Sequence, residues 1–384
     1  MVYAYNLIMF FGLGVLLSFM SVFFTTETSL TASQVTMMMS FAPIISFFST
    51  NFFAFISDKT RQHKKVLMTA MVLAIITSIT LATVAQYEAV ALVILSYVVF
   101  SFFMSSPGAL SDNFVMQYSN IKNIPYGRIR LFGSLGYAIA GQVAGYLTDS
   151  FGLTIIFWVY ALCIFIPLIF VPKFPDIEDV DDHEEEVTVE SKGIYKNLVQ
   201  NKPYVATIIV SFFILGSVQA TGTFFGLYIT QHANLSLTFL GTTILISAGT
   251  EIPMMFFSDK LIEKFGAYKI LAVSATLNTI RFLAYFFFPV KWVIIAVTLT
   301  HGVGYGSAFT SVMHLIGENV SAKVRASAIS INTTVAIGLG SFAITFLGSI
   351  FLDARSIYVA LAAFEFIGLL LCLYLILRHK EFKQ

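Results

Sequence analysis

Charged residues are scarce in this chain, and their scarcity excludes most classes of protein. Only 11% of its 384 residues are Asp, Glu, Lys or Arg, whereas a soluble domain carries about 25%. So few charges cannot cover a water-facing surface, and 57% of the residues are apolar. The composition excludes a soluble enzyme, a nucleic-acid-binding protein and a disulfide scaffold, and it predicts a polytopic membrane protein in contact with the lipid bilayer.

Cysteine is also nearly absent. Cys163 and Cys372 both lie inside apolar runs, where small buried side chains are expected instead of a disulfide or a metal site. The first apolar run, residues 4–24, has no basic n-region and no small-residue cleavage site, so we expect a retained span and not a signal peptide. We find no ATP-binding loop and no metal-ligand cluster in the sequence. We therefore expect no enzymatic activity, no catalytic residues, no metal and no cofactor.

Long apolar runs dominate the rest of the chain. A helix that crosses the bilayer needs about 20 such residues, and these runs lack the short alternating pattern of a β-barrel. The predicted fold class is therefore an all-α polytopic membrane protein with twelve transmembrane helices. The runs are residues 4–24, 36–56, 66–85, 89–118, 131–147, 153–171, 204–230, 238–257, 267–288, 292–316, 326–351 and 357–377.

One long polar segment, residues 172–203, separates the sixth run from the seventh. Its nine acidic residues outnumber its four lysines. A solvated linker is the first interpretation, and an acidic docking site for a regulator is the alternative. The predicted organisation is an N-terminal six-helix bundle (1–171), an acidic cytoplasmic linker (172–203) and a C-terminal six-helix bundle (204–384).

Basic residues predict the orientation in the membrane. With the N-terminus in the cytoplasm, 19 of the 22 Lys and Arg residues fall on the cytoplasmic side. Only Lys291 and Arg355 fall outside, and Arg281 lies within a span. Both termini are therefore expected in the cytoplasm, and we expect a bacterial cytoplasmic membrane.

An internal repeat supports two equivalent halves. Asp58 and Lys59 follow the second run, and Asp259 and Lys260 follow the eighth, 201 residues later. Two six-span halves with parallel symmetry are the plan of a transporter with a substrate site near the midplane. The Ser-Asp-Lys segments resemble the loop between spans two and three of the major facilitator superfamily, and the resemblance covers the whole chain. It implies alternating access, with these four residues in loops that change conformation.

A narrower resemblance lies at residues 126–137. Their sequence is similar to the start of span five in the lactose-permease branch of that superfamily, which contains proton symporters of oligosaccharides, nucleosides and phenylpropionate. The resemblance implies that Asp112 and Arg130 bind the substrate. It also places Tyr137 where these sugar transporters have a Trp that stacks on the sugar ring.

The same resemblance implies a proton-coupling network in the second half. Arg281 and His301 match an Arg of span nine and a His of span ten. Gly304 stands where the relatives have an essential Glu, and Glu251 is about one turn later than their span-eight Glu. Lactose itself and the details of the relay therefore do not transfer.

Charged side chains inside a membrane are costly, so each is a candidate functional residue. At 1.5 Å per residue, Glu251, Arg281 and His301 fall at depths that would let all three line one aqueous cavity. Glu251 is a proton carrier, a structural partner of Arg281 or a substrate ligand; His301 is a proton-coupling group or a buried neutral side chain.

Other polar positions have weaker signals. Asp112 and Arg130 are either substrate ligands or a salt bridge at the membrane boundary. Tyr305 and Gln142 are expected to line the cavity. Glu365, on a span expected to face lipid or a neighbour, has an open role. Gly302, Gly304 and Gly306 are expected to weaken the helix beside His301.

The predicted function is proton-coupled import of a small polar solute by a monomeric secondary transporter. Sugars or oligosaccharides are favoured, with nucleosides or aromatic acids next. Efflux of drugs or metabolites by proton antiport is the main alternative, a membrane sensor or lipid flippase is a further one, and sodium is the alternative coupling ion.

Overall fold

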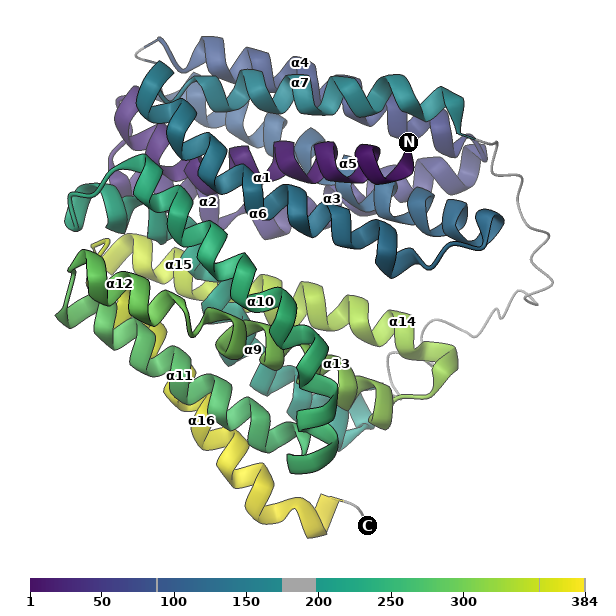
Figure 1. Cartoon of the computed structure of the whole chain (residues 1–384), viewed down its shortest axis with the longest axis vertical. Helices are drawn as coiled ribbons and strands as arrows, with labels where there is room; N and C mark the ends of the chain where they lie inside the picture. Colours follow the sequence, from purple (N-terminus) through teal and green to yellow (C-terminus); the bar gives the residue numbers. More distant parts are fainter. Residues whose placement is uncertain (88, 175–197, 352, 383–384) are drawn as a thin grey trace. The chain divides into compact units, whose positions relative to one another are not determined.

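The computed structural model describes residues 1–87, 89–174, 198–351 and 353–382, which fold into helices joined by short loops (Figure 1). These residues form two compact units. The first contains the described residues up to 174 together with Leu235–Leu245, and the second contains the others. Residues 175–197 of the predicted acidic linker lie outside the described residues, so the role of that linker stays a prediction.

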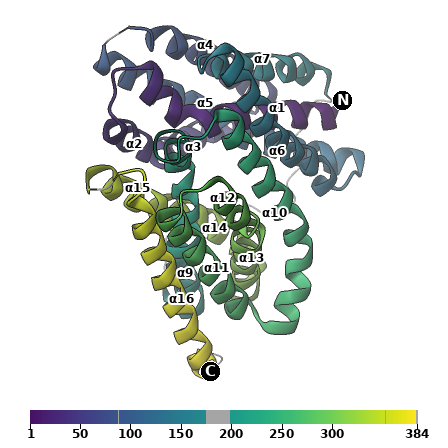
Figure 2. The ribbon, with the colours of Figure 1, turned by 60° about the vertical axis from the view of Figure 1, so that its left-hand side comes forward.

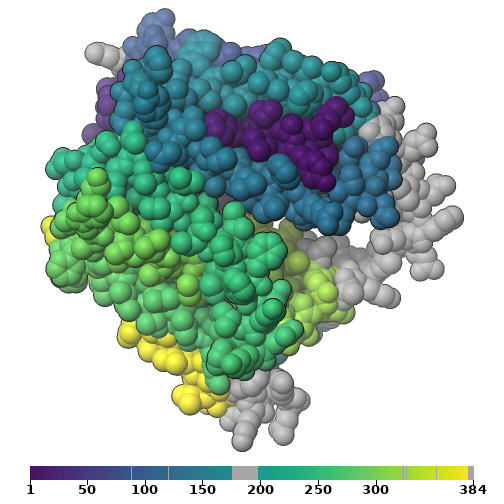
Figure 3. Space-filling model, in the orientation of Figure 1, coloured from purple at the N-terminus to yellow at the C-terminus, as the bar shows by residue number. Residues whose placement is uncertain are grey.

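The first unit is centred on one buried helix. Helix α1 contacts α6 and α7 along its length, and only a strip of it reaches the face shown in Figure 3. Of the spans in the described residues, α1 has the largest buried share, 61%. The helices of this unit are α1 (Val2–Glu27), α2 (Ala32–Ser40), α3 (Ala42–Thr60), α4 (His63–Val84), α5 (Val90–Lys122), α6 (Tyr126–Phe151), α7 (Ile155–Phe170) and η1 (Val171–Lys173).

Local sequence explains why the second predicted span consists of two helices. Thr31 and Gln34 form a capping box that begins α2, because each side chain satisfies a backbone N–H of the other residue. Pro43 follows at the start of α3, where the missing N–H of proline is tolerated but the preceding helix cannot continue undisturbed. Together α2 and α3 are long enough to span the membrane.

The second unit is also helical in its described residues and contains more irregular turns. Helix α10 begins among the residues of the first unit and continues into the second. The elements of this part are α9 (Lys202–Leu227), η2 (Tyr228–His232), α10 (Leu237–Phe265), α11 (Ala267–Phe287), α12 (Lys291–Thr298), η3 (Gly302–Gly306), α13 (Ser307–Asn319), α14 (Ala322–Ile331), η4 (Asn332–Gly338), α15 (Leu339–Phe351) and α16 (Ile357–Phe382).

The predicted all-α fold with membrane spans is confirmed. Among the described residues, eleven segments are long and apolar enough to cross a bilayer. Helix α6, 26 residues long, is the remaining predicted span. Its arginines and glycines lower its mean hydropathy without shortening it. Cys163 and Cys372 are free and buried, as expected.

Helices α9, α11 and α16 lie side by side in the second unit (Figure 2). Glu365, on α16, is fully buried among them. The sequence left open whether this position faces lipid or a neighbour, and the structure shows that it does not face lipid.

Candidate functional site

Three predicted residues of the second unit form a continuous chain. The guanidinium nitrogen Nη1 of Arg281 lies 2.5 Å from Nδ1 of His301, and Nε2 of His301 lies 3.9 Å from the Glu251 carboxylate. Arginine can only donate hydrogen bonds, so Nδ1 accepts and His301 carries its proton on Nε2, on the side of Glu251. Arg281 is only 3% exposed. The depth prediction that grouped these residues agrees with this geometry.

Glycine residues allow the turn after His301 to lie close to the part of α10 that carries Glu251. A methyl group added at Gly302 would lie 2.1 Å from the backbone oxygen of Thr250, next to Glu251. The N–H of Gly302 donates to the Thr250 hydroxyl at 3.2 Å. Residues Gly302–Gly306 form the π-helical turn η3 directly after His301, a feature frequent at functional sites. The expected weak helix beside His301 is therefore present.

Gly302→Ala is expected to disturb this site more than Gly306→Ala. The added methyl group at Gly302 meets backbone at 2.1 Å, whereas the one at Gly306 has its nearest backbone atom at 3.2 Å. Overpacking costs about 1–3 kcal/mol, so Gly302→Ala should lower the thermal unfolding temperature and solute uptake. Equal behaviour of the two variants in both measurements would contradict this account of the close approach.

Tyr305 extends the chain by stacking. Its ring lies 5.7 Å from the His301 ring, nearly parallel to it, and is 6.1 Å from Phe309. Tyr305, which was expected to line the cavity, therefore lies with the residues that were predicted to couple protons in its own unit, and its ring packs against the imidazole of His301.

The first unit brings together the predicted substrate ligands. The carboxylate of Asp112 on α5 lies 3.7 Å from Nε of Arg130 on α6, and both side chains are 36% exposed. Tyr126 donates its hydroxyl to the same carboxylate at 3.2 Å. The Arg130 guanidinium lies 4.1 Å from the centre of the Phe10 ring on α1, a cation–π contact that orients its planar group.

A hollow of about 580 Å³ opens beside this pair, lined by Met116, Ser119, Asn123, Ile124, Pro125 and Tyr126. Tyr126 connects it to Asp112. The hollow therefore reaches the pair only through Tyr126, and the partial exposure of Asp112 and Arg130 suits either a ligand or a boundary salt bridge.

The remaining predicted substrate residues lie further along α6. Tyr137 is half-buried two turns after Arg130, and on a helix this spacing gives the same face. The side-chain oxygen of Gln142 accepts a hydrogen bond from the Thr242 hydroxyl at 2.9 Å. Thr242 belongs to Leu235–Leu245, the start of α10 that falls in the first unit.

The repeated Asp-Lys pairs occupy matching positions near the ends of α3 and α10. Asp58 and Lys59 are exposed, and so are Asp259 and Lys260, while the preceding serine is buried in each copy. The expected placement of these four residues in loops is wrong, because all of them lie within the last turns of helices α3 and α10, where their side chains contact solvent. Their role in conformational change stays a prediction.

Some residues around the site were missed by sequence reasoning. Ser217 and Asn278 both donate to the Glu365 carboxylate. Neutral polar residues are too common in spans to stand out. The one available signal was the i, i+3 spacing of Asn278 and Arg281, which places both on one face of α11.

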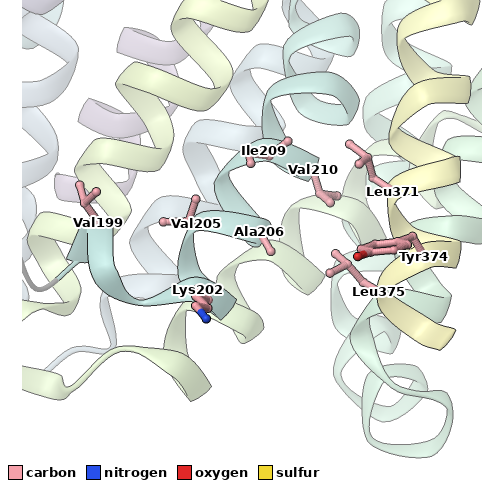
Figure 4. Close-up of a pocket in the computed structure, with 9 residues that line it drawn as sticks. All are labelled: Val199, Lys202, Val205, Ala206, Ile209, Val210, Leu371, Tyr374 and Leu375. Atoms are coloured by element: carbon pink, nitrogen blue, oxygen red, sulfur yellow. The ribbon is translucent and has the colours of Figure 1, made fainter. Parts of the chain in front are cut away.

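A separate pocket of about 360 Å³ lies between the start of α9 and the end of α16 (Figure 4). Its walls are mostly apolar, and Lys202 is the charged residue among those that line it (Figure 4). Such a lining does not provide the polar groups that orient a polar solute. The Asp112 and Glu251 regions remain the candidate functional sites.

Comparison with known proteins defines the class. The structure superposes on the nucleoside transporter NupG with a TM-score of 0.83, at 16% identity, over 98% of both chains. It superposes on a D-xylose-proton symporter with a TM-score of 0.72, at 12% identity, over 97% of this chain and 95% of that one. These likenesses show the fold, that of a multi-pass transporter of the major facilitator type.

The chain belongs to the MFS_1 like family, whose model matches residues 2–362. It is 26% identical to the maltose permease of Geobacillus stearothermophilus over 379 residues, 97% of this chain and 93% of that protein. It is 29% identical to the uncharacterized transporter YwbF of Bacillus subtilis (strain 168) over 384 residues, 98% of this chain and 93% of that protein. The predicted superfamily is confirmed, and the chain is a transporter.

Proposed function

We propose that this transporter imports a sugar or oligosaccharide together with a proton. The observation that carries the proposal is the chain Arg281–His301–Glu251 in the second unit, in which Arg281 is buried and the other two side chains are partly buried. Buried ionisable groups in a transporter are the usual means of coupling protonation to conformational change. The relative named as a maltose permease supports a sugar as the substrate class.

Glu251 is the proton carrier in this proposal. His301 cannot take a second proton at Nδ1 while Arg281 donates to that atom. Glu251 can gain or lose a proton without breaking this contact, because it faces Nε2 of His301. In this proposal His301 stays neutral and connects Arg281, which is always charged, to the carboxyl group of Glu251, which gains and loses the proton.

Substrate binding is assigned to the first unit. The Asp112 carboxylate accepts hydrogen bonds and the Arg130 guanidinium donates them. A sugar hydroxyl can do both, so it can donate to Asp112 and accept from Arg130. Tyr137 and Gln142 of the same unit supply the aromatic and neutral polar groups of a typical solute site.

The charge pattern supports the proposed orientation in the membrane. We place both termini in the cytoplasm of a bacterial cell, on the side that receives 19 of 22 basic residues. The transporter is proposed to work as a monomer, without a cofactor, on the energy of the proton gradient.

The test is to add a panel of sugars, oligosaccharides, nucleosides and aromatic acids to de-energised cells that make the protein. The proposal expects the medium to become alkaline on addition of a sugar, with no change in cells that lack the transporter. If no solute moves protons, the symport proposal fails. Solute uptake found only in everted vesicles would show export instead.

A further inference from the structure

Glu365 lies outside the chain of residues assigned to proton coupling, yet it is fully buried. Its oxygen Oε1 accepts a hydrogen bond from the Ser217 hydroxyl at 2.6 Å and another from the Asn278 amide at 3.1 Å. Its other oxygen, Oε2, has no hydrogen-bond partner, and neither does Oδ1 of Asn278. Two buried acceptor oxygens of one hydrogen-bonded pair therefore lack a donor.

An ionised Glu365 would be a poorly compensated charge. Among the described residues, no cationic nitrogen lies within 4.0 Å of its carboxyl oxygens. Arg281, the cation on the same face of α11 as Asn278, has its Nη1 hydrogen-bonded to His301. A buried charge without a partner costs several kcal/mol, whereas one proton on Oε2 removes the charge and supplies a donor at that unpartnered oxygen.

We propose that Glu365 is a second proton-binding site of the transporter, neutral in the state seen here and able to exchange its proton during transport. The exchange of this proton during transport depends on the proposed proton symport. The presence of the proton on Glu365 in the state seen here does not depend on it. When Oε2 loses its proton, Arg281 becomes the counter-ion of the carboxylate and leaves His301. Nδ1 of His301 is then free to accept a proton, so the cluster keeps the same net charge.

The surroundings of Glu365 restrict the proton to few places. Helix α11 contributes Arg281 and Tyr285, α9 contributes the Ser217 hydroxyl, and α15, residues Leu339–Phe351, has no titratable side chain. On α16 itself the nearby groups are Tyr358 and Cys372, and Tyr358 contacts Tyr228 of η2.

Asn278 links this site to the relay. Besides Glu365, its amide nitrogen contacts the backbone oxygen of Gly304 in η3 at 3.3 Å. A methyl group added at Gly304 would meet the Asn278 side chain at 2.2 Å. A change in the charge of Glu365 therefore reaches the turn that follows His301 through one side chain.

Infrared difference spectroscopy of the full-length protein in lipid, between neutral and alkaline pH, tests the resting proton. We expect a protonated-carboxyl C=O band that is missing in Glu365→Gln and retained in the matched variant Glu251→Gln. An identical band in Glu365→Gln and the wild type would overturn the proposal. If Glu365→Gln fails to fold, Ser217→Ala replaces it. That variant should shift the band to higher frequency, because the C=O group loses a hydrogen bond, and an unshifted band would overturn the proposal.

The exchange of the Glu365 proton during transport is tested by adding a transported solute to the same sample. We expect the Glu365 band to change amplitude on addition, and a constant band would overturn the exchange. A failure of the proposed symport can be told apart from a failure of this inference, because the C=O band of protonated Glu365 is first measured without any solute.

Discussion

Glu251→Gln is expected to abolish accumulation of the solute against its gradient while leaving exchange of internal for external solute. The amide keeps the size and hydrogen-bonding capacity of the side chain but cannot carry the transported proton. The Arg281–His301 contact does not involve Glu251, so the rest of the site should keep its geometry. Radiolabelled solute uptake and counterflow in the same membrane vesicles measure both quantities.

Glu318→Gln provides the matched control for this variant. Glu318 is also a glutamate of the second unit with a histidine neighbour, 3.3 Å from His314, but its side chain is 62% exposed. Exposed pairs of this kind contribute little, so accumulation should be unchanged. If Glu251→Gln accumulates solute as the control does, Glu251 is not the proton carrier.

Arg130→Lys is expected to weaken solute binding strongly without destabilising the protein. Lysine keeps the charge but loses the planar group that lies 4.1 Å from the Phe10 ring. Hydrogen bonds to charged groups contribute about 1.5–3 kcal/mol, so the apparent affinity should fall by roughly 10-fold to 100-fold. Asp112→Asn should give a loss of the same order, measured by the solute concentration at half-maximal uptake.

This pair of variants also decides between the two interpretations of Asp112 and Arg130. As a half-exposed salt bridge at 3.7 Å, the pair contributes only about 0–1 kcal/mol to stability, and its loss would leave affinity unchanged. Arg128→Lys is the control, because Arg128 is exposed on the same helix. An affinity in Arg130→Lys equal to that of Arg128→Lys would assign the pair to the membrane boundary.

Composition and run length were enough to predict the helical membrane fold, because a bilayer imposes the same requirement on every span. The span in α6 was found from its apolar run, residues 131–147, which begins just after Arg128 and Arg130 in the first turns of that helix. The break of the second span at Pro43 and the π-helical turn after His301 depend on local geometry that a count of apolar residues does not register.

The charged residues of the candidate site could be predicted from the sequence, because charges inside membrane spans are rare. The neutral polar residues that complete the site could not be predicted. Depth along the helices brought Glu251, Arg281 and His301 together, because the rise per residue is fixed. Helix rotation is not fixed by depth, so the burial of Glu365 against Ser217 and Asn278 needed the packing of α9, α11 and α16.

The central claim is that proton movement drives sugar import, and the purified transporter in liposomes tests it most directly. An acid exterior imposed in the absence of sodium should drive accumulation of the sugar identified in the panel. An uncoupler should reduce the internal concentration to that outside. Accumulation that requires a sodium gradient and ignores the pH difference would contradict the account.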